Sequence, residues 1–189
     1  MNEIQLIREQ LARERAHATA VARAGATALG STDAAQITSG SPLDEFRQRC
    51  VDYLVCVLAS FEERDLRLAE LVRARQGADD PARRALEEVL SRRGRSRETL
   101  EQLEAAFAGS GAPGARAAPA GWGAFLAYFD SAWSARRDAL EALLASNPRV
   151  SDWRTVGGID ADSILEERRR FARVRDTLPS GVTLDAAPA

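Results

Sequence analysis

Glu14 and His17 are the residues of this chain whose types and spacing point most directly to chemistry. His17 is the only histidine in the sequence, and Glu14 precedes it in the stretch "LARERAH". A Glu-x-x-His spacing places a carboxylate and an imidazole on one face of a helix. In four-helix bundles such pairs provide ligands for di-iron and di-manganese centres. The alternative is a chance pair in a chain rich in Glu, Arg and Ala.

Length, composition and charge bound the class of protein. The chain has 189 residues, 45% hydrophobic and 29% charged, with a net charge of −2, which predicts one globular domain and gives no overall field that favours nucleic acid or acidic membranes. No apolar run approaches the roughly 18 residues of a membrane span, and the N-terminus lacks the pattern of a secretory signal. Cys50 and Cys56 fall in an apolar run and are typical of buried, reduced thiols. These features predict a cytoplasmic protein with neither a nucleic acid nor a membrane as partner.

Apolar residues recur at helical spacing along most of the chain, and no segment alternates like a strand. Ser41 and Pro42 predict a helix start, and Ser163 with Glu166 has the spacing of a capping box. The predicted helices cover residues 2–25, 42–77, 80–108, 122–145 and 163–175. The predicted fold class is all-α: an antiparallel up-down four-helix bundle with an additional C-terminal helix. A single domain is expected over residues 1–175, followed by a flexible tail at 176–189.

The apolar stripe of each long helix is interrupted by polar residues near mid-length. In antiparallel neighbours these interruptions would stack at a similar height inside the bundle. Buried charges are costly unless they are paired, so the pattern predicts a network of arginines and carboxylates. The alternative is that some of the arginines extend to the solvent at the rim. The residues concerned are Glu14, Arg64, Asp65, Arg93, Arg97 and Arg136.

The chain resembles the hemerythrin-like family of four-helix bundles, and the resemblance covers most of its length. It rests on "IREQLARERAH", "VDYLVCVLASFEERD", "FLAYFDSAWSARRDALEALL" and "DADSILEERRRFARV", a match of pattern and length. In that family, histidines and carboxylates from all four helices hold a non-haem di-iron centre. The resemblance implies that His17 corresponds to the histidine of the first helix. It also implies that the ligands of the second helix would fall near Phe61 and Asp65.

The third and fourth helices depart from the family pattern, because they offer Arg93, Arg97 and Arg136 where histidines are expected. A guanidinium stays protonated and has no lone pair for a metal. The resemblance therefore favours the fold and argues against the di-iron centre. A metal site, if retained, would use His17, Glu14 and Asp65 with iron or manganese.

Three functions follow from these observations. The first is a metal-free, degenerate hemerythrin-like bundle that acts as a structural or ligand- or partner-binding module. It would form a homodimer through part of the aromatic set at the fourth helix, with Trp122 or Tyr128 as the better interface candidate. The alternative is that the set fills the core, which is favoured for Phe125 and Phe129. The full set is Trp122, Phe125, Tyr128, Phe129 and Trp133.

The second function is binding of a small anionic ligand through the arginine layer of Arg64, Arg93, Arg97 and Arg136. The third is an iron- or manganese-dependent oxygen or redox sensor. The sequence indicates no enzyme class, because the single histidine lies mid-helix without a serine or cysteine arrangement around it.

Overall fold

The computed structural model describes residues 3–30, 41–74, 149–157 and 161–185, together with isolated positions between 83 and 127. Within these residues the regular structure is helical and contains no strand. The helices are α1 (Glu3–Gly30), α2 (Pro42–Ala74), α5 (Val150–Gly157) and α6 (Ala161–Asp176). The predicted all-α class is consistent with this part of the chain.

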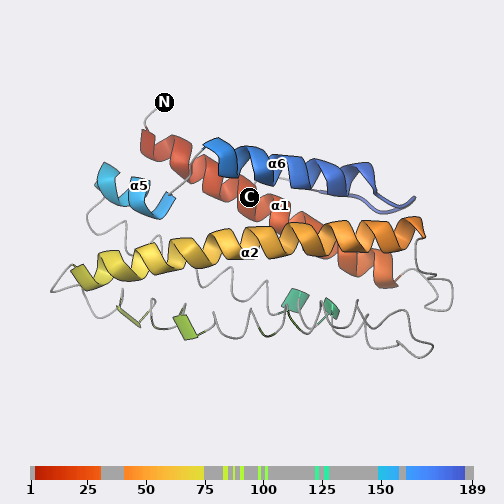
Figure 1. Ribbon diagram of the computed structural model, residues 1–189, viewed down its shortest axis with the longest axis horizontal. Helices are drawn as coiled ribbons and strands as arrows, with labels where there is room; N and C mark the ends of the chain where they lie inside the picture. Colours follow the sequence, from red (N-terminus) through yellow and green to blue (C-terminus); the bar gives the residue numbers. More distant parts are fainter. Residues whose placement is uncertain are drawn as a thin grey trace.

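Three of the described helices, α1, α2 and α6, lie side by side and contact one another. In Figure 1, α2 runs in the direction opposite to α1 and α6, and the short α5 lies near the start of α1. The predicted third and fourth helices, 80–108 and 122–145, fall mostly outside the described residues, although the described positions within them are helical. The four-helix up-down arrangement therefore stays a prediction.

The main core forms where small residues of α1 meet large residues of α2. Ala18, Val21 and Ala22 of α1 are fully buried, and they pack in one cluster with larger side chains of α2, which include Phe46, Tyr53, Leu54 and Phe61. Small side chains let the two backbones approach closely, and the larger ones fill the space between them.

Trp122 inserts its ring into this core. The indole is fully buried, and its Nε1 donates a hydrogen bond to the carbonyl oxygen of Ala22 at 2.8 Å. A Cβ atom at Gly25 would lie only 2.0 Å from Cζ2 of Trp122, so glycine is required at this close approach. The prediction of Trp122 as a dimer-surface residue is therefore wrong. The end of the first helix also differs from prediction, because α1 continues past residue 25 with Ala28 buried.

The start of α2 is confirmed in detail. The backbone N–H of Asp44 donates to Oγ of Ser41 at 3.2 Å, and that of Glu45 donates to the Ser41 carbonyl at 3.0 Å. The Ser41 side chain thus satisfies the backbone donor of Asp44, which a helix start leaves without a partner, and the Ser41 carbonyl accepts the first hydrogen bond of the helix, as an N-cap residue does. Pro42 occupies the first helical position, where its missing N–H costs nothing.

The sequence analysis did not predict α5. Trp153 of α5 packs with Leu11, Ile4 and Ile7 in a second, smaller cluster that attaches α5 to the start of α1. A Cβ atom at Gly157 would lie 2.7 Å from Cγ2 of Ile7, so α5 and α1 are in close contact there.

The last helix and the residues after it also differ from the prediction. α6 begins at Ala161, so Ser163 lies inside its first turn and is not the residue that precedes the helix. Beyond the helix, Leu178, Val182 and Leu184 pack against the main core. The expected flexible tail is therefore part of the packed structure at least as far as Leu184.

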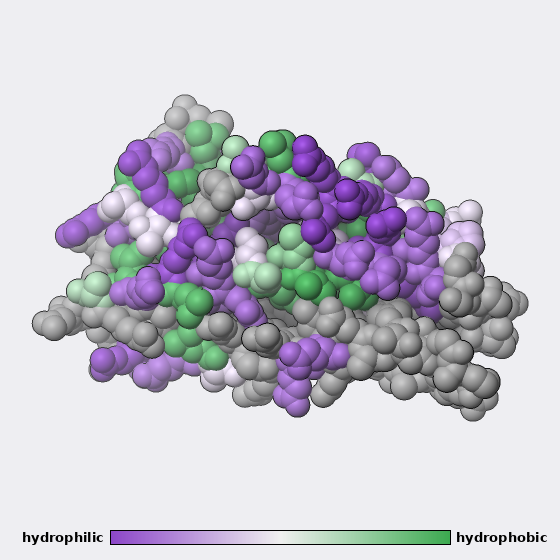
Figure 2. Space-filling view, in the orientation of Figure 1, coloured by the Kyte–Doolittle hydropathy of each residue, from purple (hydrophilic) through white to green (hydrophobic). Residues whose placement is uncertain are grey.

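On the side of the molecule that Figure 2 shows, the surface over α6 is mostly polar. Figure 2 shows hydrophilic side chains over α6 and hydrophobic ones gathered over the middle of α2. Among the described residues, no helix combines the length and the apolar character needed to cross a membrane.

Candidate functional site

Glu14 and Arg64 form a buried ion pair that joins α1 to α2. Nη1 of Arg64 donates to Oε2 of Glu14 at 2.6 Å, and the two side chains are only 8% and 6% exposed. The other carboxylate oxygen, Oε1, accepts from Nε2 of Gln10 at 3.1 Å. The guanidinium also lies 5.3 Å from the ring centre of Phe61. The prediction was a network of arginines and carboxylates, and the described residues contain one buried ion pair of that kind, Arg64 with Glu14.

A second buried polar cluster centres on Glu167 of α6. Its Oε1 accepts one hydrogen bond from the Tyr53 hydroxyl at 2.7 Å and a second from Nδ1 of His17 at 2.9 Å. The His17 ring stacks on Phe171, with ring centres 3.9 Å apart and an angle of 10° between the planes. Glu167 therefore connects α1, α2 and α6 through a single carboxylate.

Helical spacing explains why these residues meet. Tyr53, Val57, Ser60 and Arg64 follow one another at steps of three and four, so they lie along one face of α2. In α6, Glu167 and Phe171 are four residues apart and lie on a common face. α2 and α6 run side by side in opposite directions (Figure 1), and the hydrogen bond between Tyr53 and Glu167 shows that these faces are turned toward each other.

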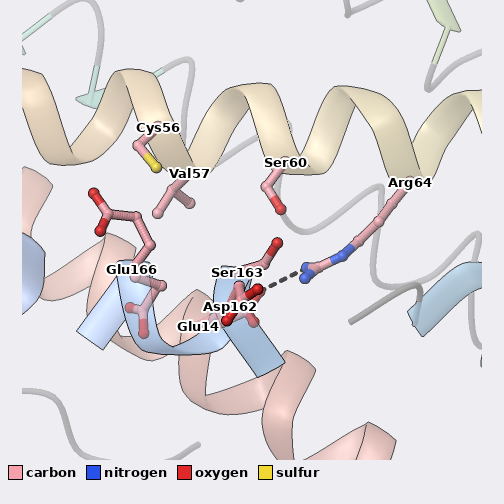
Figure 3. A pocket seen from close by; sticks show the side chains of 9 residues that line it. Glu14, Cys56, Val57, Ser60, Arg64, Asp162, Ser163 and Glu166 are labelled. Carbon is pink, nitrogen blue, oxygen red and sulfur yellow. Dashed lines mark hydrogen bonds and ion pairs between the residues drawn. The ribbon is translucent and has the colours of Figure 1, made fainter. Parts of the chain in front are cut away.

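A cavity of about 300 Å³ opens between these faces. In Figure 3, Cys56, Ser60 and Arg64 project from α2 toward residues of α6 and toward Glu14 of α1. Val57 and Glu167 are buried in its wall, whereas Asp162 and Ser163 are exposed and belong to the first turn of α6. The full lining is Glu14, Cys56, Val57, Ser60, Arg64, Asp162, Ser163, Glu166 and Glu167.

Burial controls the acid–base properties of the groups around the cavity. It raises the pKa of the Tyr53 hydroxyl far above the usual range, and the nearby Glu167 carboxylate adds to this effect. Burial also raises the pKa of the Cys56 thiol, although the Arg170 guanidinium opposes the shift. Both groups therefore stay protonated at neutral pH, where Tyr53 acts as a hydrogen-bond donor and Cys56 as a weak nucleophile.

The structure separates the residues predicted to bind a metal. Glu14 is paired with Arg64, and His17 is bonded to Glu167. Asp65 is buried but is not one of the described residues that line the cavity. Within the described ranges, no group of three or more His, Cys, Asp and Glu residues is placed to hold a metal ion. Binding of iron or manganese stays a prediction.

Of the four arginines in the predicted layer, only Arg64 lies within the described residues. Its guanidinium is engaged by Glu14 and faces a wall that carries further carboxylates. Arg93, Arg97 and Arg136 lie outside the described residues, and so do Phe125, Tyr128, Phe129 and Trp133 of the aromatic set. Binding of an anion by the full layer, and a homodimer formed by the remaining aromatics, stay predictions.

The sequence analysis missed Glu167, which is the most connected residue of the site. It lies in the charged stretch "LEERRRF", which is typical of an exposed helix face. A signal was nevertheless present, because Ile164, Glu167, Phe171 and Val174 follow one another at helical steps and place Glu167 on the apolar stripe.

Comparisons with protein-family models, curated proteins and solved structures found no match to this chain. The resemblance to hemerythrin-like bundles therefore stays a prediction, and the site is interpreted from its own geometry.

Proposed function

We propose that this protein is a binding module that holds a small molecule in the cavity between α1, α2 and α6. The observation that carries the proposal is a cavity of about 300 Å³ with buried polar groups fixed in its wall. This volume lies at the lower end of the range for ligand pockets, about 300–1,000 Å³. Preorganised polar groups in a small cavity reduce the cost of ordering the site when a ligand binds.

The chemistry of the lining favours binding over catalysis. The Cys56 thiol is a weak nucleophile because burial raises its pKa. His17 directs Nδ1 at Glu167 and packs its ring on Phe171, so it is held in a structural contact. A general base would instead need to lie within hydrogen-bond reach of a nucleophile or substrate.

The proposal develops the first of the functions expected from the sequence. A degenerate hemerythrin-like bundle would use its interior for a small molecule in place of a di-iron centre. Support comes from Glu14 and His17, the predicted metal residues, whose polar atoms are bonded to Arg64 and Glu167.

A fragment screen tests this function. Ligand-observed NMR on the full chain would identify binders, which would then be titrated against Ser60→Leu and Ala59→Leu. Ser60 lines the cavity, whereas Ala59 is exposed on the same helix, so the two variants add equal bulk inside and outside the site. We expect the cavity variant alone to abolish binding.

Two results would overturn the proposal. One is a wild-type chain that binds no fragment, or that binds fragments which Ser60→Leu leaves unaffected. The other is elemental analysis of protein purified without chelator from iron- and manganese-supplemented cells. Metal at about two equivalents per chain, lost in His17→Ala, would favour the metal-dependent sensor instead.

A further inference from the structure

Two ion pairs account for most of the charged groups that line the cavity. Nη1 of Arg64 donates to Oε2 of Glu14 at 2.6 Å, and Nε of Arg170 donates to Oε1 of Glu166 at 2.7 Å. Each pair brings opposite charges into contact, so their fields largely cancel at the distance of a molecule in the cavity. These four residues therefore offer a ligand little net charge.

The two remaining carboxylates of the lining are also poorly placed to bind a charged ligand. Oε1 of Glu167 accepts hydrogen bonds from Tyr53 at 2.7 Å and from His17 at 2.9 Å, and Oε2 is fully buried. Asp162 is exposed in the first turn of α6, where water and the positive end of the helix dipole stabilise its charge. Among the described residues, the interior of the cavity thus presents no accessible charge that lacks a partner.

Three residues of α2 provide the rest of the lining, namely Cys56, Val57 and Ser60. Val57 is buried and apolar, and the Cys56 thiol behaves as a small apolar group because burial raises its pKa and keeps it protonated. The Ser60 side chain points from α2 toward α6 (Figure 3). Within the described part of the chain, its hydroxyl has no hydrogen-bond partner. This side of the cavity therefore combines apolar surface with one available hydroxyl.

We infer that the cavity takes an uncharged, mainly apolar molecule that carries one hydroxyl or carbonyl group. The apolar body would pack on Val57 and Cys56, and the polar group would form a hydrogen bond with the Ser60 hydroxyl, which can donate or accept. A charged molecule would lose its hydration on entry without gaining an available counter-charge, which is costly. This inference rests on the proposed function and specifies its ligand class.

A matched series of probes tests the charge preference on the full chain. Benzyl alcohol, benzylamine and benzoate share one ring, and at neutral pH they are uncharged, positive and negative, respectively. We expect NMR titrations of the wild-type protein to give benzyl alcohol an affinity at least about tenfold higher than either charged probe, because only the charged probes lose a strongly held hydration shell. Ser60→Leu should abolish the binding of benzyl alcohol, which would place it in the cavity.

The variant Ser60→Ala assigns the polar contact to one hydroxyl. Benzyl alcohol and ethylbenzene have nearly the same shape, but only the alcohol forms a hydrogen bond. We expect the variant to weaken benzyl alcohol about fivefold, as the loss of one hydrogen bond does, and to change ethylbenzene less than about twofold. Alanine is a better helix former than serine, so the variant should fold. The control is Ser151→Ala, which removes an exposed hydroxyl from α5 and should leave both affinities unchanged.

The outcomes separate the two proposals. If a charged probe binds as tightly as benzyl alcohol and Ser60→Leu abolishes its binding, the inference of an uncharged ligand fails and the binding function stands. An equal effect of Ser60→Ala on benzyl alcohol and ethylbenzene would remove the hydrogen bond assigned to Ser60. If benzyl alcohol binds too weakly to measure, the fragments that Ser60→Leu displaces decide, and a majority of charged ones would overturn the inference. Should no fragment or probe be sensitive to Ser60→Leu, both proposals fall.

Discussion

Replacing Arg64 with methionine would leave the Glu14 carboxylate buried without its charged partner. The two side chains are 8% and 6% exposed, and the paired atoms lie 2.6 Å apart. Removing one member of such a pair costs about 3–5 kcal/mol. Gln10 donates to the other oxygen of Glu14 in the wild-type protein as well, so this hydrogen bond does not replace the lost ion pair. We therefore expect Arg64→Met to lower the free energy of unfolding by about 3 kcal/mol.

A double-mutant cycle with Glu14→Met measures the interaction itself. Each single variant leaves one buried charge unpaired, whereas the double variant removes both charges and is expected to be more stable than either single variant. The assay is urea unfolding followed by circular dichroism, which gives the free energy of unfolding of all four proteins. The expected coupling energy is about 3 kcal/mol.

The surface pair Glu63–Arg67 provides the control. Its atoms are 2.5 Å apart, but the side chains are 64% and 35% exposed, so solvent screens the attraction. Such pairs contribute about 0.3–0.5 kcal/mol in helices. If the coupling of Glu14 with Arg64 were also below about 1 kcal/mol, the reasoning from burial would be refuted.

The remaining predictions concern packing and pH. Gly25→Ala should destabilise the fold by about 1–3 kcal/mol because its Cβ would overlap the Trp122 ring. Gly123→Ala should be neutral or stabilising because nothing lies within 4 Å of the added Cβ. Thermal unfolding compares the two variants, and equal melting temperatures would contradict the packing argument. Burial raises the pKa of Tyr53 and Cys50 in the folded state, whereas the unfolded groups ionise near about 10 and 8.5. The stability that they contribute is complete below those values and falls as the pH rises above them, by about 1.4 kcal/mol per pH unit for each group. Urea unfolding at alkaline pH measures this slope, which Tyr53→Phe should reduce; a slope that this variant leaves unchanged would remove Tyr53 from the explanation.

The parts of the fold that could be predicted from the sequence are those with strong local signals. Ser41 and Pro42 predict the start of α2 because capping depends on neighbouring residues alone. Glu14 and Arg64 could be assigned to a buried charge network because each interrupts an otherwise apolar stripe, and a buried charge needs a partner of the opposite sign; which residues pair was not predicted.

Other features depend on contacts between distant segments. The helix α5 is only eight residues long, and its buried Trp153 is stabilised by packing on Leu11 of α1. α1 continues past Gly25, where it packs against the Trp122 ring from a remote part of the chain and buries Ala28 in the core. Glu167 was missed for a similar reason, since its partners Tyr53 and His17 lie on two other helices.

The Glu167 cluster also determines the register in which α6 docks. Only Glu167 and Val174 of this helix are buried, so apolar area alone would distinguish poorly between neighbouring alignments. A shift of one turn, about 3.6 residues, would place Ser163 or Phe171 opposite Tyr53 and His17. Neither residue carries a carboxylate that could accept both hydrogen bonds, so the shifted alignment leaves buried donors without partners. A single buried carboxylate thus makes one alignment of a highly charged helix unique, as a buried polar residue does in a coiled coil.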